Sequence, residues 1–491
     1  MNEEEQKSRA AAFGKYALSA FIFAGLVVIC IYKNSAAITY PVYMVGLLVL
    51  LHKVLPLKLN DNATKCYVLA LLLLSVSKCT TASWTLQRLD GIAVFLLFFS
   101  LVIHTVCEDG GWEFPKRLRA LCKAVVEPWL HAFTLFVDQA AFIREKRNKS
   151  EKSVLGFVGI GLLIALPLVF IVLLLLGSAD KVFGDMVESV IDKLFFLEYL
   201  PDYFGLIVWF TGALLGWYAG SKFFAEEPFT VADSQRKQYH AVVGITINTV
   251  LTVIYVLFSG VQFAVLFTGG MALPGKYTYA EYAHQGFYQL VIVCLLNLMV
   301  VTISKALFAE NKALKILLAI ICCCTYVMIA SGVLRMLLYV RAYQFTFLRL
   351  FVLWAMAILA ICLTAVLLNI FLPKVNVYRV SLVAVTIGYL LFAYVHPDYW
   401  IARYNMSKET TWMTPRFDMS KGPVEPSAYD QRYLIDNLSA DAVPAYLKDA
   451  ALLERYKQAY YLEHDSSESV FYKVRHFNIS EAVAEYLMEK Q

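Results

Sequence analysis

Long apolar segments separated by short polar connections occupy most of this chain. The clearest segment, Val154–Leu176, contains no charged residue. A bilayer core about 30 Å thick is crossed by a helix of about 20 apolar residues, and this criterion predicts eleven spans. They are Tyr16–Tyr32, Ala36–Leu51, Tyr67–Val76, Gly91–Cys107, Val154–Leu176, Phe204–Gly220, Ala241–Phe267, Leu290–Phe308, Leu314–Leu334, Leu348–Leu372 and Val380–Val395. The third is short and ends near Lys78, so we expect it to be tilted, re-entrant or longer than its apolar part.

The composition excludes a soluble globular protein and a disordered one. Of 491 residues, 59% are hydrophobic and 16% are charged, and the mean hydropathy is +0.61. Soluble proteins carry about 45–50% apolar and about 25% charged residues. The predicted fold class is therefore all-α: a polytopic helical membrane protein with about eleven transmembrane helices. We expect residues 1–395 to form the multi-pass domain and residues 396–491 a small, soluble helical region.

The distribution of basic residues predicts the orientation. With the N-terminus in the cytoplasm, the predicted inner segments carry 23 Lys and Arg and the predicted outer loops carry 9. Basic residues are retained on the cytoplasmic side, so we expect a cytoplasmic N-terminus in a bacterial inner membrane. Eleven spans then place residues 396–491 outside, and an error of one span would reverse that placement. The inner bias is greatest in the basic loop 108–153.

Two connecting segments are themselves apolar enough to form surface helices. Leu121–Ile143 lies between basic clusters within the loop 108–153. It is predicted either to lie in the inner leaflet as an amphipathic helix or to pack beneath the bundle. The acidic outer segment 178–203 is predicted to contain another short surface helix.

Motifs for familiar chemistries are absent from the sequence. There is no phosphate-binding Gly-rich loop, paired-His metalloprotease helix or nucleophile elbow, and the eight His residues lack metal-ligand spacing. Cys322-Cys323-Cys324 has no His or carboxylate nearby, so we predict no catalytic, metal or cofactor site. The basic clusters are explained by topology, which argues against a nucleic-acid partner. Asn248, Gln262 and Asn297 are expected to hydrogen-bond between helices.

Polar residues gather near the predicted outer face and form a candidate site. The four-residue spacing places Arg335, Tyr339 and Tyr343 along one helical face. One interpretation is a polar pocket in which Glu281 and Asp398 pair with arginines. The favoured interpretation is a set of interfacial anchors and ordinary ion pairs. The candidate residues are Glu281, Tyr282, Arg335, Tyr339, Tyr343, Arg349, Asp398, Arg403 and Asn405.

Four stretches carry a family resemblance. They are TYAEYAHQGFYQL (278–290), RMLLYVRAYQFTFLRL (335–350), HPDYWIARYNM (396–406) and LSADAVPAYL (438–447). Together they resemble the signature blocks of a bacterial polytopic membrane family known only as a domain of unknown function, over roughly residues 154–487. The family pattern has an acidic residue at the position of Arg341 and Gly at that of Gln344, so this chain departs at both. The resemblance implies the fold and the membrane location, and no reaction.

Residues 396–491 contain no spanning segment. Helices are predicted around Tyr429–Leu438, Asp441–His464 and Ser480–Lys490, with Asp441 and Ser480 as N-caps. The stretch 410–428 is predicted to be a linker. A region of this size is expected to dock on the bundle for part of its stability.

Three functional hypotheses follow. The leading one is a non-enzymatic, envelope-associated membrane component or partner-binding scaffold, which contacts the bilayer and an envelope or membrane protein through the C-terminal region. The first alternative is a transporter or lipid-handling protein with an outward-facing polar cavity lined by Glu281, Arg335 and Tyr339. The second is a membrane enzyme acting on lipid or envelope precursors, in which Glu281 or Asp398 would point into such a cavity.

Overall fold

The computed structural model describes most of the chain as helices. The described residues are 3–34, 36–112, 114–149, 200–226, 229–231, 239–268, 287–407, 431–463 and 474–490, with single residues between 172 and 186 and the strand residues 417–418 and 422–423. The bundle helices are α1 (Glu3–Cys30), α2 (Thr39–Val54), α3 (Asn62–Thr80), α4 (Trp84–Val106), α5 (Phe114–Leu130), α6 (Thr134–Lys149), α9 (Leu200–Glu226), α10 (Ala241–Thr268), α12 (Phe287–Leu307), α13 (Lys312–Tyr343), α14 (Phe347–Phe371) and α15 (Val377–Tyr394).

The remaining elements form a tail, defined here as α16 to α21. They are α16 (Pro397–Met406), β1 (Phe417–Asp418), β2 (Gly422–Pro423), α17 (Gln431–Asn437), the 3₁₀ helix η2 (Ala440–Ala442), α18 (Val443–Tyr446), α19 (Ala450–Glu463) and α21 (Ile479–Lys490). Strands β1 and β2 are a two-residue antiparallel pair. The fold is all-α, as predicted.

Among the described residues, eight helices are long and apolar enough to cross a membrane: α1, α3, α4, α10, α12, α13, α14 and α15. Each predicted span except Val154–Leu176, most of which lies outside the described residues, coincides with a helix. Two of these, α2 and α9, are not among the eight; α2 has 16 residues. The short third span proves to be longer than its apolar part, because α3 has 19 residues.

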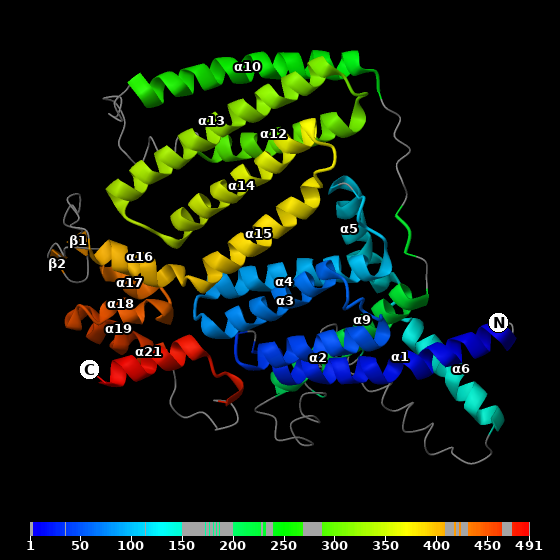
Figure 1. The fold of residues 1–491 in the computed structure, drawn as a ribbon. Coiled ribbons are helices and arrows are strands. Elements are labelled where there is room, and N and C mark those ends of the chain that lie inside the picture. The colour runs from blue at the N-terminus through cyan, green and yellow to red at the C-terminus, as the bar shows by residue number, and fades with distance from the viewer. Residues whose placement is uncertain are drawn as a thin grey trace.

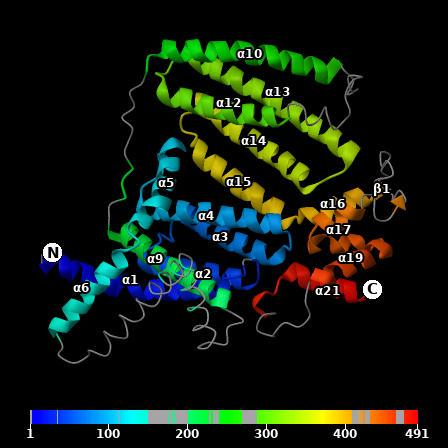
Figure 2. The same ribbon diagram turned by 180° about the vertical axis from the view of Figure 1, so that it is seen from behind.

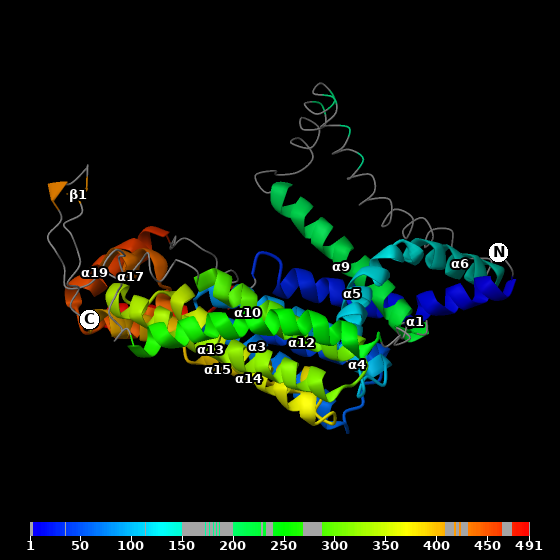
Figure 3. The same ribbon diagram turned by 90° about the horizontal axis from the view of Figure 1, so that it is seen from above.

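The long helices lie side by side, and their connections gather at two ends of the bundle (Figures 1 and 2). The N-terminal end carries the start of α1, α5, α6 and the α14–α15 turn, where Asn376 donates to the carbonyl of Gly110 at 3.1 Å. The tail end carries the α1–α2, α3–α4 and α13–α14 connections together with the tail. Viewed from above, the bundle is a flat band from which α9 diverges (Figure 3).

Two apolar clusters make up the bundle. One is built mainly from α1–α4, α9 and α15, and the other from α10 and α12–α14. On α10, the side chains of Val250, Ile254 and Leu257 are exposed, as expected of a helix that faces lipid rather than water.

Hydrogen bonds link the helices of the second cluster. Asn248 of α10 donates to Ser304 of α12 at 3.1 Å, and Asn297 of α12 donates to Thr325 of α13 at 2.9 Å. Gln262 of α10 accepts from Ser331 of α13 at 2.7 Å. The predicted role of the three amides is confirmed.

Helices α5 and α6 form a pair bent by 50° at the N-terminal end. Ala120 and Ala124 are fully buried, and α6 packs on α1, where the rings of Phe142 and Phe13 lie 5.2 Å apart. Leu130, just before the bend, is exposed. The segment therefore packs beneath the bundle and presents apolar side chains outward as well. The surface helix predicted within 178–203 falls almost wholly outside the described residues.

The tail has its own apolar core around Tyr446, Leu452 and Met488. The single helix predicted over Asp441–His464 is wrong, because the chain turns after α18 and Asp449 then caps α19 by accepting from the amides of Ala451 and Leu452.

Both predicted N-caps of the tail are also wrong. The side chain of Ser439 caps η2, and that of Asn478 accepts from the amide of Ser480 at 2.9 Å. The hydroxyl of Ser480 instead donates a hydrogen bond to the carboxylate of Asp441.

Candidate functional site

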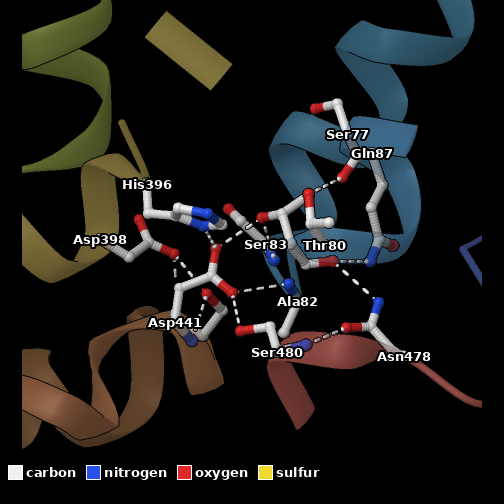
Figure 4. Close-up of polar contacts among 12 residues, drawn as sticks. Ser77, Thr80, Ala82, Ser83, Gln87, His396, Asp398, Asp441, Asn478 and Ser480 are labelled. Carbon is white, nitrogen blue, oxygen red and sulfur yellow. Dashed lines mark hydrogen bonds and ion pairs between the residues drawn. The ribbon is translucent and has the colours of Figure 1, made fainter. Parts of the chain in front are cut away.

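A buried polar junction fastens the tail to the bundle at the α3–α4 turn (Figure 4). The carboxylate of Asp441 accepts from the hydroxyl of Thr81 at 2.5 Å and from the amide of Ala82 at 2.7 Å. It also accepts from the hydroxyl of Ser480, and His396 Nδ1 lies 3.3 Å from Oδ2. A carboxylate offers about four acceptor positions, and at Asp441 four donors fill them.

Asp398 lies at the same junction and is almost fully buried. Its carboxylate accepts from the hydroxyl of Ser439 at 2.6 Å. This bond holds the start of η2 against α16. The predicted pairing of Asp398 with an arginine is not what the structure shows.

Burial and hydrogen bonding shift the pKa values at the junction in different directions. Burial by itself would raise the pKa of Asp441, but the hydrogen bonds from His396, Ala82, Ser480 and Thr81 outweigh it and hold that pKa below its usual value. The hydrogen bond to Asp441 raises the pKa of His396, against the effect of burial. Burial raises the pKa of Asp398. The charged pair formed by His396 and Asp441 is thus favoured, whereas ionisation of Asp398 is opposed.

The tail also reaches the α1–α2 connection. Asn478 donates to the carbonyls of Thr81 and Ala36, each at 2.9 Å. Arg475 donates to the carbonyl of Val28 at 3.2 Å and to that of Tyr32, so a cation sits at the C-terminal end of α1, where carbonyls lack helical partners and the helix dipole is negative.

This junction does not have the geometry of a catalytic centre. The hydroxyl of Ser480 bonds to Asp441 rather than to His396, so there is no nucleophile held by a base. Every carboxylate oxygen of Asp441 already accepts from the protein. The arrangement stabilises the docked tail.

Several residues of the predicted outer-face site have partners in the described part of the chain. Arg335 donates to Gln262 at 3.1 Å. Tyr339, Tyr343 and Arg349 lie together: the two rings are 5.2 Å apart, and the guanidinium of Arg349 is 4.0 Å from the ring centroid of Tyr339.

Of the other members of the predicted site, Asn405 and Arg403 have described partners elsewhere. Asn405 bonds to the amide and the carbonyl of Phe345 in the α13–α14 connection, each at 2.9 Å. Arg403 donates to Tyr399 on its own helix at 3.3 Å. Glu281 and Tyr282 lie outside the described residues.

The two positions that depart from the family pattern have different surroundings. Gln344 ends α13 with φ 63° and ψ 176°, a conformation that Gly adopts freely and other residues adopt with strain. The Gly that the resemblance implies at this position would suit this backbone, and the guanidinium of Arg349, donating to the carbonyl of Gln344, helps to hold it here. Arg341 is exposed.

A cavity of about 650 Å³ lies between α1, α2, α4, α5 and α9. Its lining runs from Ile31 and Tyr40 near the tail end to Val54 and Trp129 near the N-terminal end, and it is predominantly apolar. The volume is that of a ligand pocket. Arg335 and Asp398 line neither this cavity nor a smaller one of about 190 Å³.

Glycines on one face of α9 help to open this space. Gly212, Gly216 and Gly220 all line the cavity and recur every fourth residue, which places them on one helical face. A Cβ added at Gly212 or Gly220 would meet nothing within 4 Å. Both positions thus face open space.

Two buried charges near the cavity are absent from the predicted site. Lys78 in the last turn of α3 is 5% exposed, and Asp90 in α4 is fully buried. Both residues were assigned to a polar connection between spans. The signal for a longer α4 is the four-residue spacing of Trp84 and Arg88, whose guanidinium lies 3.3 Å from the Trp84 ring centroid. Among the described residues, no group of three or more His, Cys, Asp or Glu is placed to hold a metal ion.

The helices, their lipid-facing apolar surfaces and the cavity define a multi-pass α-helical membrane protein. The chain belongs to the family described as a domain of unknown function (DUF4153), whose model matches residues 68–448. This match begins earlier than the resemblance predicted and ends before α19. Searches of curated proteins and of solved structures returned no match to the chain.

Proposed function

We propose that this protein binds membrane lipid, with one or more acyl chains held in the cavity between α1, α2, α4, α5 and α9. The observation that carries the proposal is the cavity itself, which is predominantly apolar and runs along α2 from Tyr40 to Val54. Inside a bilayer, the molecules available to fill such a space are lipids. Among its described lining residues, the hydroxyl of Ser221 has no His, Cys or carboxylate beside it to act as a base, so a binding or lipid-handling role is favoured over catalysis.

The glycines of α9 allow a direct test. Gly212→Phe or Gly220→Phe should place a ring in the cavity, because both glycines line it and a Cβ added at either position meets nothing within 4 Å. The matched control is Gly260→Phe on α10, where an added Cβ also meets nothing within 4 Å and which lines neither described cavity. Native mass spectrometry of the purified full chain should show lipid retained by the wild type and the control and lost from the cavity variants. Equal retention by all of them would refute the proposal.

The scaffold hypothesis is a second candidate. It is supported by exposed apolar side chains on the neighbouring helices α19 and α21, among them Leu462, Val483 and Tyr486. In this proposal the tail contacts an envelope or membrane protein. Leu462→Glu with Tyr486→Glu should abolish site-specific crosslinking from the tail to one partner, whereas the exposed-site control Glu454→Gln should not. Crosslinking unchanged by the double substitution would count against it.

We also propose that the N-terminal end faces the cytoplasm of a bacterium and that the tail lies outside. Support comes from the basic residues of α5 and α6, which lie at the N-terminal end. Native Cys66 and Cys122 are exposed and lie on the α3 and α5 segments at that end. An impermeant thiol reagent on intact cells should label Glu454→Cys in the tail and spare Cys66 and Cys122. The reverse pattern would overturn this orientation.

A further inference from the structure

Lys78 lies beside the tail-facing end of the cavity, behind residues that line it. Its ammonium is 4.3 Å from the ring centroid of Tyr40 and 3.5 Å from the position of a Cβ built on Gly91, and both of these residues line the cavity. The absence of a side chain at Gly91 thus leaves room for the cation. Within the described part of the chain, no oxygen accepts a hydrogen bond from Lys78 and no carboxylate forms an ion pair with it.

Asp90, the second buried charge, lacks a hydrogen-bond donor at one of its carboxylate oxygens. Its Oδ1 accepts from the hydroxyl of Tyr389 on α15 at 2.7 Å, and the hydroxyl of Ser77 lies beside the carboxylate, whereas its buried Oδ2 has no hydrogen-bond partner. Asp90 is close enough to interact electrostatically with Lys78 without forming an ion pair with it. The site therefore lacks an acceptor at Lys78 and a donor at Asp90.

Charges within a membrane protein are costly and face the protein interior or a cavity, where they mark functional sites. A buried polar group without a partner costs about 1–3 kcal/mol, and more when it is charged. A ligand that supplies both missing partners would remove these costs. Because Lys78 and Asp90 carry opposite charges, the ligand that leaves the site neutral carries one negative and one positive group.

We propose that Lys78 and Asp90 form a headgroup site for a zwitterionic phospholipid of the phosphoethanolamine type. The phosphate accepts from Lys78, the ammonium donates to Oδ2 of Asp90, and an acyl chain enters the cavity beside Tyr40 and Gly91. This inference rests on the proposed lipid-binding function and names its ligand. An anionic phospholipid would leave one uncompensated negative charge at the site.

The test measures which lipid the full-length protein retains when phosphatidylethanolamine, phosphatidylglycerol and diacylglycerol are offered in equal amounts in detergent, read by native mass spectrometry. We expect phosphatidylethanolamine to be retained about tenfold over each of the others, which corresponds to about 1.4 kcal/mol. Lys78→Gln should reduce retention of both phospholipids to that of diacylglycerol. The matched control is Lys65→Gln, which removes an exposed Lys at the other end of α3 and should leave the preference unchanged.

Asp90→Asn separates headgroup recognition from a purely structural role. It removes the negative charge while keeping an acceptor for Tyr389, so the preference should shift toward phosphatidylglycerol. Soluble glycerophosphoethanolamine should fail to displace the lipid at equal concentration, because it has no acyl chain. Displacement by it would overturn a lipid source for the headgroup.

Three further results would overturn the headgroup site. They are equal retention of all three lipids, a wild-type preference for phosphatidylglycerol, and an unchanged preference in Asp90→Asn. Failure of the broader proposal is distinguishable, because in that case Gly212→Phe would retain as much lipid as the wild type. Loss of headgroup preference with retention still blocked by Gly212→Phe would reject the headgroup site alone.

Discussion

The polar junction around Asp441 and the buried pair Lys78 and Asp90 lie close together in the chain, since Lys78 is three residues from Thr81. At the junction, the Asp441 carboxylate accepts from three groups besides its contact with His396. At the pair, one carboxylate oxygen has no partner. Buried polar groups are almost always hydrogen-bonded in proteins. The contrast therefore separates a polar cluster that holds the fold together from one that is ready for a ligand.

Of the substitutions that test this contrast, Asp441→Ala should have the largest effect on the stability of the docked tail. Asp441→Ala leaves the hydroxyls of Thr81 and Ser480 and the amide of Ala82 without their acceptor, which should destabilise the docked tail by about 3–5 kcal/mol. Hydrogen exchange of the amides in α21 should accelerate by about a hundredfold or more.

The matched control is Asp436→Ala, which breaks an exposed ion pair with Arg432. It should change tail stability by less than about 0.5 kcal/mol. If Asp441→Ala resembled this control, the junction would not hold the tail.

A change of pH should have an intermediate effect on the stability of the docked tail. The pKa of His396 is raised above 6.5 by its bond to Asp441, so its stabilisation is complete below 6.5 and is lost as pH rises through the raised value. Asp441 has a lowered pKa, so its contribution is lost only as pH falls through that lower value. Asp398, with its raised pKa, favours docking only at acidic pH and loses that contribution as pH rises.

Docking of the tail should therefore weaken above pH 6.5. Because His396 is partly exposed, the change in tail hydrogen exchange, corrected for intrinsic rates, should stay below about tenfold. His396→Gln should flatten the dependence above pH 6.5. An unchanged profile in that variant would assign the titration to another group.

The smallest effect on stability is expected at the pair. Replacing a buried charge pair by apolar residues is often neutral or stabilising, so Lys78→Met with Asp90→Leu should leave the melting temperature in detergent unchanged or raised. The corresponding apolar replacement at the junction, Thr81→Val with Asp441→Leu, should lower it clearly. Equal losses in the two double variants would show that both clusters are structural.

Hydropathy is sufficient to predict most of this fold because lipid imposes a simple length rule on apolar helices. The amides Asn248, Gln262 and Asn297 were also predictable, since a polar group within a span needs a partner on a neighbouring helix. Within the tail, by contrast, the hydroxyl of Ser480 has a partner 39 residues away in sequence. Local spacing cannot reveal such a contact, and the predicted caps were wrong for this reason.

The candidate site was less predictable than the fold. The cavity depends on how the five helices that line it are spaced, which no periodicity encodes. The predicted spans leave Lys78 and Asp90 in the connection between them. The turn between α3 and α4 is in fact only three residues long, so both residues belong to helix ends. In the predicted outer-face site, Asp398 accepts from Ser439 of the tail rather than from an arginine, and Asn405 binds the backbone of Phe345 in the α13–α14 connection.

The hydrogen bond from Arg475 to the carbonyl of Val28 can form only late in synthesis of the chain. Its partners are 447 residues apart in the chain, so at 5–20 residues per second the ribosome delivers the arginine roughly 20–90 s after the first hairpin. The carbonyl of Cys30 can accept from the nearby hydroxyl of Thr39, whereas the carbonyls of Val28 and Tyr32 wait for Arg475 while the rest of the bundle is inserted. In a chain stalled during insertion, the C-terminal end of α1 would stay accessible to membrane proteases. Arg475 protects that end once it reaches the same side of the membrane and forms its hydrogen bonds.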